Sequence, residues 1–232
     1  MLDGKLVLVT GASRGIGKAI ALTLGGAGAT IIGTATTEVG ADNISKVFAD
    51  KKISGKGIKL NVTNNEQISS LVKIVNEDFG PIDILINNAG IGHGIDGLDG
   101  LDVSLIQEAI DINVSSPIKL TAALLDSMKE QARGHIVNIG SVAGLHTLYS
   151  SLYGATKSAI HLFSQNLRAE LHGTPIRVTE ICPGRVSTGF FQAATGNEER
   201  LKALGHSGIK ELTPTDIADA VLYALSAPAH VN

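Results

Sequence analysis

The sequence predicts a doubly wound α/β fold, in which helices cover both faces of a parallel sheet. Two observations lead to this prediction. Short apolar runs alternate along most of the chain with longer segments of helical pattern, and this alternation is typical of α/β folds. Most of the apolar runs are nearly continuous in Val, Ile and Leu, which indicates strands that are buried on both faces.

Six strands are expected from these apolar runs, and the segments between them are long enough for crossover helices. The strands are predicted at 5–10, 30–35, 57–61, 82–87, 135–140 and 177–181. The helices between them are predicted at 15–27, 38–50, 65–79, 102–131 and 150–172.

The last part of the sequence departs from this alternation. Residues 187–212 combine small residues, a Phe pair and mixed polarity, and we expect a lid of short helices there. Residues 213–228 have an apolar face and begin with Thr213 or Thr215, either of which suits a helix N-cap. This segment is therefore predicted to be the final helix.

Composition and charge favour a single domain over residues 1–232. Hydrophobic residues make up 44% of the chain and charged residues 18%, without a linker or low-complexity tract, so one large core can be buried. The net charge of −3 argues against nucleic acid as a partner, because phosphate binding needs clustered Lys and Arg. No apolar run approaches the roughly 18 residues that a membrane span needs.

The cysteine content and the N-terminus favour a cytoplasmic location. The single Cys182 allows no disulfide within the chain and fits a reducing compartment; it ends a predicted strand and is expected in the core. The N-terminus enters an apolar strand at once and lacks a signal-peptide layout. The seven His residues have no metal-ligand spacing, so no metal site is expected.

A glycine-rich turn, "LVTGASRGIGKAI" at 8–20, joins the first strand to the first helix. Its glycines allow a tight turn, and the free N–H groups at a helix start favour an anionic phosphate. A turn that binds nothing is the structural alternative. A triphosphate-binding P-loop does not fit, because Ala12 and Ala19 replace residues that this motif requires.

The end of the second predicted strand favours NADP over NAD. An acid at this place would bind the ribose hydroxyl of NAD, but no acid occurs before Glu38. Arg14 in the glycine turn, with the hydroxyls of Thr36 and Thr37, would instead meet a 2′-phosphate. The alternative for Arg14 is a solvated surface cation.

Taken together, these motifs resemble the short-chain dehydrogenase/reductase family. They occur in that family's order and extend from residue 5 to residue 190. Residues 1–91 look most like 3-oxoacyl-[acyl-carrier-protein] reductases, and the chain after Ile91 looks more like general carbonyl reductases. The motifs are "TGASRGIG" (10–17), "NNAG" (87–90), Asn113, Ser141, "YGATK" (153–157) and "PGRVST" (183–188).

The resemblance implies a Rossmann-type sheet of order 3-2-1-4-5-6, without the family's usual seventh strand because the chain ends early. It also implies hydride transfer between NADP(H) and a carbonyl or alcohol carbon. Asn61 stands where the family commonly has an Asp near the adenine. The implied cofactor-binding residues are Gly11, Ser13, Arg14, Gly15, Ile16, Gly17, Thr36, Thr37, Asn61, Val62, Asn87, Ala89, Gly90, Tyr153, Lys157, Pro183, Gly184, Val186 and Thr188.

The implied catalytic set is Asn113, Ser141, Tyr153 and Lys157. Residues four apart lie on one helix face, so Lys157 can approach Tyr153 and favour its phenolate. Lowering the Tyr153 pKa by about 2 units would need ~2.7 kcal/mol of preferential phenolate stabilisation. Ser141 would donate to the substrate oxygen, and Asn113 would hold a water that links Lys157 to solvent.

Each member of this set also has a structural alternative. Ser141 can cap a loop, Asn113 can be a hydrogen-bonding residue inside a helix, and the Tyr–Lys pair can be a half-buried helix face. The Phe pair at 190 and 191 either lines the substrate pocket or packs the lid.

Two loops leave the substrate open. The segments 92–100 and 142–152 depart from the acyl-carrier reductase pattern, so a small-molecule carbonyl is expected and an acyl thioester is the alternative. A hydroxy-acid or sugar-alcohol dehydrogenase and a non-catalytic NADP-binding protein also remain open. The long helices at 102–131 and 150–172 are expected to pair across a two-fold axis in a homodimer or homotetramer.

Overall fold

The computed structural model describes residues 1–148, 150–195, 210–228 and 230–231. It contains a six-stranded sheet of order β3-β2-β1-β4-β5-β6, with every neighbouring pair parallel. The predicted fold, strand order and six strands are confirmed. The strands are β1 Leu6–Val9, β2 Thr30–Ala35, β3 Gly55–Lys59, β4 Ile84–Asn87, β5 Gly134–Ile139 and β6 Ile176–Ile181.

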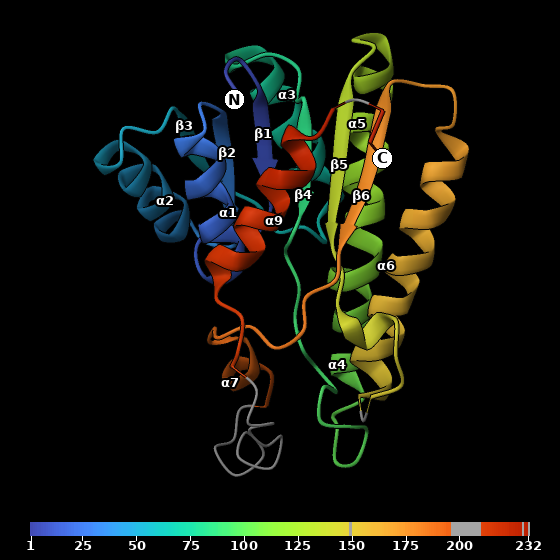
Figure 1. Cartoon of the computed structure of the whole chain (residues 1–232). Coiled ribbons are helices and arrows are strands. Elements are labelled where there is room, and N and C mark those ends of the chain that lie inside the picture. The colour runs from blue at the N-terminus through green and yellow to red at the C-terminus, as the bar shows by residue number, and fades with distance from the viewer. Residues whose placement is uncertain (149, 196–209, 229, 232) are drawn as a thin grey trace.

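Helices cover both faces of this sheet (Figure 1). One core lies under α1 (Gly15–Gly26), α2 (Glu38–Asp50) and α9 (Pro214–Ser226). The other core lies under α3 (Asn65–Asp78), α5 (Ser116–Glu130) and α6 (Ser151–Glu170). The central strands β1 and β4 are buried along their whole length, which explains their unbroken apolar runs.

The predicted helix at 102–131 is divided by a π-helical turn. It consists of α4 (Ser104–Ile110), the π turn Asp111–Ser115, and α5. A π turn locally shifts the direction of the following side chains, and Asn113 within it is only 2% exposed. The interruption therefore lies at a candidate site residue.

The C-terminal part of the chain is only partly described. The short helix α7 (Phe190–Thr195) and an isolated bridge between Val186 and Leu212 belong to the predicted lid, whereas 196–209 lie outside the described residues. Thr213 caps α9 through a capping box with Asp216, as its residue type predicts. Within the described ranges, no strand of the sheet follows β6, and no helix is both long and apolar enough to cross a membrane.

A buried histidine at the start of β5 makes stability depend on pH. His135 is 5% exposed, and burial together with the nearby Arg177 lowers its pKa from 6.5 to about 3. In the unfolded chain, His135 binds a proton below pH ~6.5. In the folded chain it binds this proton only near pH 3. The free energy of unfolding should therefore fall by up to about 1.4 kcal/mol per pH unit between these values.

Urea denaturation at pH 6.5 and at pH 5.0 measures this effect. The native protein should lose about 1.6 kcal/mol more than His135→Gln over this interval, because Gln does not titrate. His172→Gln is the matched control, since His172 is exposed. Equal losses in the native protein and His135→Gln would contradict the prediction.

Candidate active site

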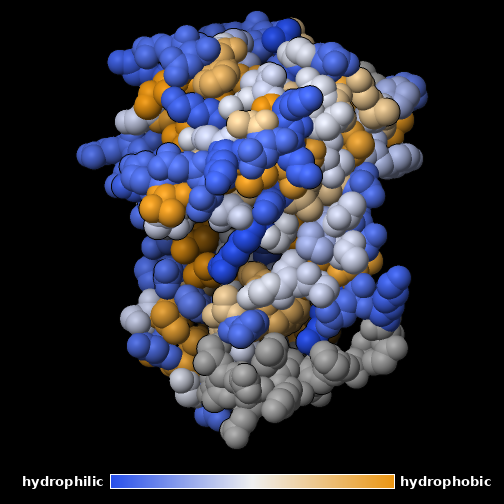
Figure 2. Space-filling model, turned by 90° about the vertical axis from the view of Figure 1, so that its left-hand side faces the viewer, coloured by the Kyte–Doolittle hydropathy of each residue, from blue (hydrophilic) through white to orange (hydrophobic). Residues whose placement is uncertain are grey.

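A cavity of about 830 Å³ opens at the carboxyl ends of the strands. Figure 2 views the molecule from the edge that carries β3 and α2 and shows a hollow there, with hydrophobic residues inside it. The strand order reverses between β1 and β4, and ligands of open α/β sheets bind at this place. The predicted site residues that line the cavity are Gly11, Ser13, Arg14, Gly15, Ile16, Gly17, Thr36, Asn61, Val62, Ala89, Gly90, Ser141, Tyr153, Lys157, Pro183, Gly184, Val186 and Thr188.

Two of the predicted cofactor contacts point elsewhere. The hydroxyl of Thr37 caps α2 by accepting a hydrogen bond from the Gly40 N–H at 3.1 Å. Asn87 is 5% exposed, and its Nδ2 donates to Asn138 Oδ1 at 2.9 Å. Asn87 lies two residues after Leu85 and therefore faces the core on the same side. Asn88, which the sequence reasoning missed, lines the cavity instead.

Asn88 and Thr10 join the turn after β1 to the turn after β4. The Thr10 hydroxyl accepts from the N–H groups of Asn88 and Ala89 at 3.0 and 2.9 Å. The Asn88 amide donates to the carbonyls of Thr10 and Gly11 at 2.8 and 3.2 Å. The first Asn of the "NNAG" motif is buried in the core, and the second lines the cavity. The sequence pattern does not distinguish these two positions.

The start of α1 fits an anionic phosphate. Gly11 and Gly15 have φ values of +65° and +55°, which favour glycine. No side chain caps the helix start, and its first turn contains no acid, so the N–H groups at this end are available to an anion. Arg14 occupies the N-cap position, is exposed and lines the cavity.

The acid nearest the end of β2 faces away from this cavity. Glu38 pairs with Lys59 at 3.4 Å and is not among the cavity-lining residues, whereas Thr36 is. Asn61 also lines the cavity, and its Oδ1 accepts from the Thr63 N–H and hydroxyl at 3.1 and 2.9 Å.

Tyr153 and Lys157 lie on one face of α6, and each is 8% exposed. Lys157 Nζ donates to the Ile139 carbonyl at 2.8 Å and lies 5.8 Å from the centre of the Tyr153 ring. Burial lowers the Lys157 pKa to about 8, although the nearby Glu180 acts in the opposite direction.

Burial raises the Tyr153 pKa to about 12, and a hydrogen bond with Ser141 partly opposes this rise. The expected lowering is therefore not produced by the groups of the protein. The physical reason is that loss of hydration disfavours the phenolate more strongly than the charge of Lys157 favours it. Lys157 Nζ is directed at the Ile139 carbonyl. At neutral pH, Tyr153 is a neutral phenol that can donate a proton.

Ser141 both caps a loop and lines the cavity. Its Oγ accepts from the Ala143 N–H at 3.1 Å, at the start of a short 3₁₀ helix, Val142–Gly144. The structural alternative is thus confirmed, and it leaves the hydroxyl hydrogen of Ser141 available beside Tyr153.

Asn113 holds the loop after β4 in place. Its Oδ1 accepts from the Ile91 N–H at 2.9 Å, and its Nδ2 donates to the Ile91 carbonyl at 2.8 Å. The same Nδ2 lies 3.1 Å from the hydroxyl of Thr156, the neighbour of Lys157. Asn113 is not among the cavity-lining residues, and a water between it and Lys157 stays a prediction.

The Phe pair covers the outer end of the site. The ring centres of Tyr153 and Phe190 are 5.8 Å apart, as are those of Phe190 and Phe191. Both Phe residues line the cavity and pack against the cluster that contains Ile95, and a role in holding substrate stays a prediction. Arg185, which the sequence reasoning did not single out, lies 4.8 Å from the Phe191 ring centre.

A group of three polar side chains lies beside the site. Atoms of His161, Glu180 and Cys182 lie within 4.8 Å of one another. Sequence spacing did not indicate this group, because α6 and the end of β6 meet only in the fold. Burial and the adjacent Glu180 raise the Cys182 pKa to about 12, so its thiol is protonated at neutral pH. Within this group, His161 Nδ1 lies 2.6 Å from Glu180 Oε2, and the absence of a metal site stays a prediction.

The sheet, the glycine turn and the crevice at the strand-order reversal define a dinucleotide-binding α/β protein. The chain belongs to the short-chain dehydrogenase family, whose model matches residues 5–199.

Relatives match over the full length of the chain. An uncharacterized oxidoreductase of Staphylococcus saprophyticus is 38% identical over 233 residues, covering 100% of this chain and 95% of the relative. One from Staphylococcus aureus strain MW2 is 35% identical over 240 residues with the same coverage.

Solved structures show the same fold. The closed form of a serine dehydrogenase complexed with NADP⁺ superposes with a TM-score of 0.89 and 34% identity, over 98% of this chain and 91% of that chain. A single-residue variant of actinorhodin polyketide ketoreductase with NADPH has a TM-score of 0.85 and 29% identity, over 97% and 91% of the two chains.

Proposed function

We propose that this protein is an NADP(H)-dependent oxidoreductase that interconverts a ketone and a secondary alcohol. The observation that carries the proposal is one continuous cavity, which reaches from the uncapped start of α1 to Tyr153, Lys157 and Ser141. The likeness to two structures that hold NADP⁺ or NADPH supports this choice of cofactor.

The nicotinamide cofactor, when bound, supplies or accepts the hydride. The protein supplies the proton: the neutral phenol of Tyr153 donates it to the carbonyl oxygen as that oxygen gains negative charge. The Ser141 hydroxyl donates a hydrogen bond to the same oxygen and stabilises its charge. Lys157 favours the phenolate that remains, which then regains a proton from solvent.

Arg14 and Thr36 support NADP rather than NAD. They line the cavity at the end of β2, where Glu38 is held by Lys59 at 3.4 Å. A 2′-phosphate at this place would meet a guanidinium, which binds phosphate in a bidentate manner.

Arg14→Ala should therefore weaken use of NADPH selectively. We expect the KM for NADPH to rise about 10-fold or more, equivalent to about 1.5 kcal/mol of a charged hydrogen bond. The KM for NADH should change less than about twofold. Lys18→Ala is the matched control, because Lys18 is exposed on the same helix and is not among the cavity-lining residues. An equal effect on both cofactors would contradict the prediction.

A steady-state panel tests the proposed function. NADPH oxidation should depend on a ketone, and the panel compares simple ketones, a 3-oxo ester and a 3-oxoacyl thioester. Activity confined to the thioester would favour the acyl-carrier reductase alternative. Tight NADPH binding without turnover of any compound would overturn the proposal and favour a non-catalytic binding protein.

A hydroxy-acid dehydrogenase is the second candidate. The observation that favours it is the TM-score of 0.89 to a serine dehydrogenase at 34% identity. Its test is reduction of NADP⁺ by serine and by other 3-hydroxy acids, compared with simple secondary alcohols. The expected homodimer or homotetramer remains a proposal, which light scattering of the purified protein measures.

A further inference from the structure

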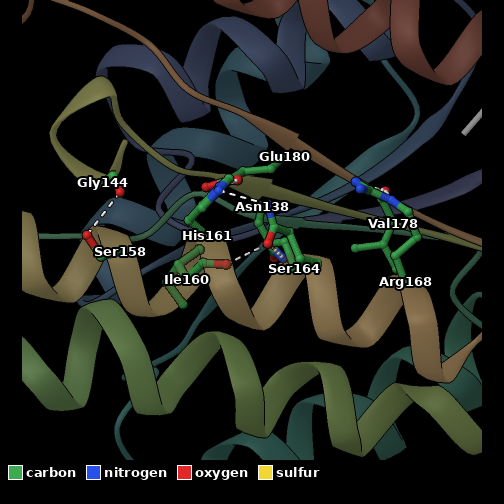
Figure 3. Close-up of polar contacts among 10 residues, drawn as sticks. Asn138, Gly144, Ser158, Ile160, His161, Ser164, Arg168, Val178 and Glu180 are labelled. Atoms are coloured by element: carbon green, nitrogen blue, oxygen red, sulfur yellow. Dashed lines mark hydrogen bonds and ion pairs between the residues drawn. The ribbon is translucent and has the colours of Figure 1, made fainter. Parts of the chain in front are cut away.

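The polar face of α6 extends beyond Tyr153 and Lys157. His161 and Gln165 follow at the same four-residue spacing, so each of these side chains lies next to the preceding one along the helix. Figure 3 shows His161 directed from α6 toward Glu180 on β6, with a contact between them. The catalytic pair therefore continues into a second polar group that the proposed mechanism does not use.

Glu180 is a buried carboxylate with one oxygen occupied by this histidine. Its side chain is 8% exposed, and Oε2 lies 2.6 Å from His161 Nδ1. The other oxygen, Oε1, is buried and has no hydrogen-bond partner in the part of the chain that the structure describes. A Cβ at Gly140 would collide with this Oε1, so the carboxylate lies directly over the backbone at the end of β5.

The histidine has a polar partner at each of its two ring nitrogens. Gln165 Nε2 lies 2.9 Å from His161 Nε2, and an amide NH₂ can only donate. His161 Nε2 therefore accepts, and Nδ1 carries the hydrogen that is donated to Glu180. In this arrangement His161 contacts the carboxylate through Nδ1 and orients it.

Asp83, a buried carboxylate next to β4 among the described residues, has cations beside it. Asp83 is paired with Arg133 at 2.6 Å and with Lys5 at 3.5 Å. Among the described residues, Glu180 has no Lys or Arg within ion-pair distance. A buried charge without a cation is costly, which suggests that the charge of Glu180 is retained for another reason.

Lys157 is the cation that this charge favours. Its Nζ is held by the carbonyl of Ile139 at 2.8 Å, and Ile139 is the residue before Gly140, over which Glu180 lies. Burial lowers the Lys157 pKa to about 8, and Glu180 is the main group that opposes this. Loss of the Glu180 charge would therefore lower this pKa further.

Among the described residues, the titratable groups around Lys157 other than Glu180 include Tyr153, whose ring centre is 5.8 Å from Nζ, and Cys182 just after β6. His161 follows one turn later on the same helix. The end of β5 and the π turn contribute the Ile139 carbonyl and Asn113, which do not titrate in this range.

We infer that Glu180, oriented by His161, is a positioning residue that keeps the Lys157 ammonium charged during catalysis. This inference rests on the proposed function, because it assigns Glu180 a part in the same proton transfer. It predicts that activity at alkaline pH depends on a carboxylate that does not touch the substrate.

Glu180→Gln tests the inference, since Gln keeps the shape and can still accept from His161. If the Lys157 pKa falls by about one unit from its native value of about 8, kcat/KM for ketone reduction should be about threefold lower at pH 7.5 and about ninefold lower at pH 9. At pH 6 it should be near the native value. His161→Arg should shift the alkaline limb in the same direction, because a cation would neutralise Glu180. This second variant keeps the test valid if Glu180→Gln does not fold.

Glu108→Gln is the matched control. Glu108 also pairs with a histidine, His93, at 3.0 Å, but neither is among the cavity-lining residues. It should leave the pH profile unchanged.

A direct titration separates this inference from the proposed function. NMR of ¹³C-labelled lysine, with Lys157→Met to assign the signal, should show a lower pKa for Lys157 in Glu180→Gln whether or not a substrate is turned over. An unchanged Lys157 titration in Glu180→Gln would overturn the inference. If the native protein is inactive on every substrate but the titration shifts, the proposed function fails and the electrostatic link between Glu180 and Lys157 stands.

Discussion

Replacement of Tyr153 by Phe is expected to lower kcat for ketone reduction by about 10³-fold, within the usual range for loss of a general acid. Phe keeps the ring that packs at 5.8 Å from Phe190 but removes the only phenol among the described residues that line the cavity. Because the lost interaction acts in proton transfer, the Kd for NADPH should change less than about threefold.

Stopped-flow or steady-state NADPH oxidation measures the rate, and fluorescence titration measures the Kd. Tyr223→Phe is the matched control, because this tyrosine is 78% exposed on α9 and should tolerate loss of its hydroxyl. If Tyr153→Phe retains more than about a tenth of the native rate, the phenol does not deliver the proton.

Gly17→Ala should produce the second large effect, on cofactor binding. A Cβ at Gly17 would collide with the Gly11 carbonyl and the Asn88 amide, which together join the two turns along the cavity. If the Gly11 carbonyl or the Asn88 amide moved to make room for the Cβ, the hydrogen bond between them would be lost. We expect the Kd for NADPH to rise about 100-fold, equivalent to about 2.8 kcal/mol.

Gly26→Ala is the control for Gly17→Ala, since it lies on the same helix and a Cβ there meets nothing within 4 Å. It should leave the Kd unchanged and keep or raise the midpoint of thermal unfolding, because Ala favours a helix. Native-like NADPH binding by Gly17→Ala would show that the turn after β1 does not form the phosphate site.

The predicted strands and most predicted helices agree with the structure because their signals are local. Runs of Val, Ile and Leu indicate strands buried on both faces, and β1 and β4 have this character. The segment 102–131 is predicted as one helix because it is long enough for a crossover between two strands. Its π turn accompanies the bonds of Asn113 to Ile91, a contact between distant segments that a local pattern does not contain.

The amino-acid sequence alone determined the strand order, through the motifs that resemble the family. It also indicated many of the residues that line the cavity, because glycine turns and four-residue spacings are local features. Only the tertiary structure separated Asn87 from Asn88, raised the Tyr153 pKa and brought Glu180 to His161 and Lys157. These properties depend on burial and on contacts between β5, β6 and α6. Desolvation and Coulomb interactions are set by distances in space, and spacing along the chain does not report them.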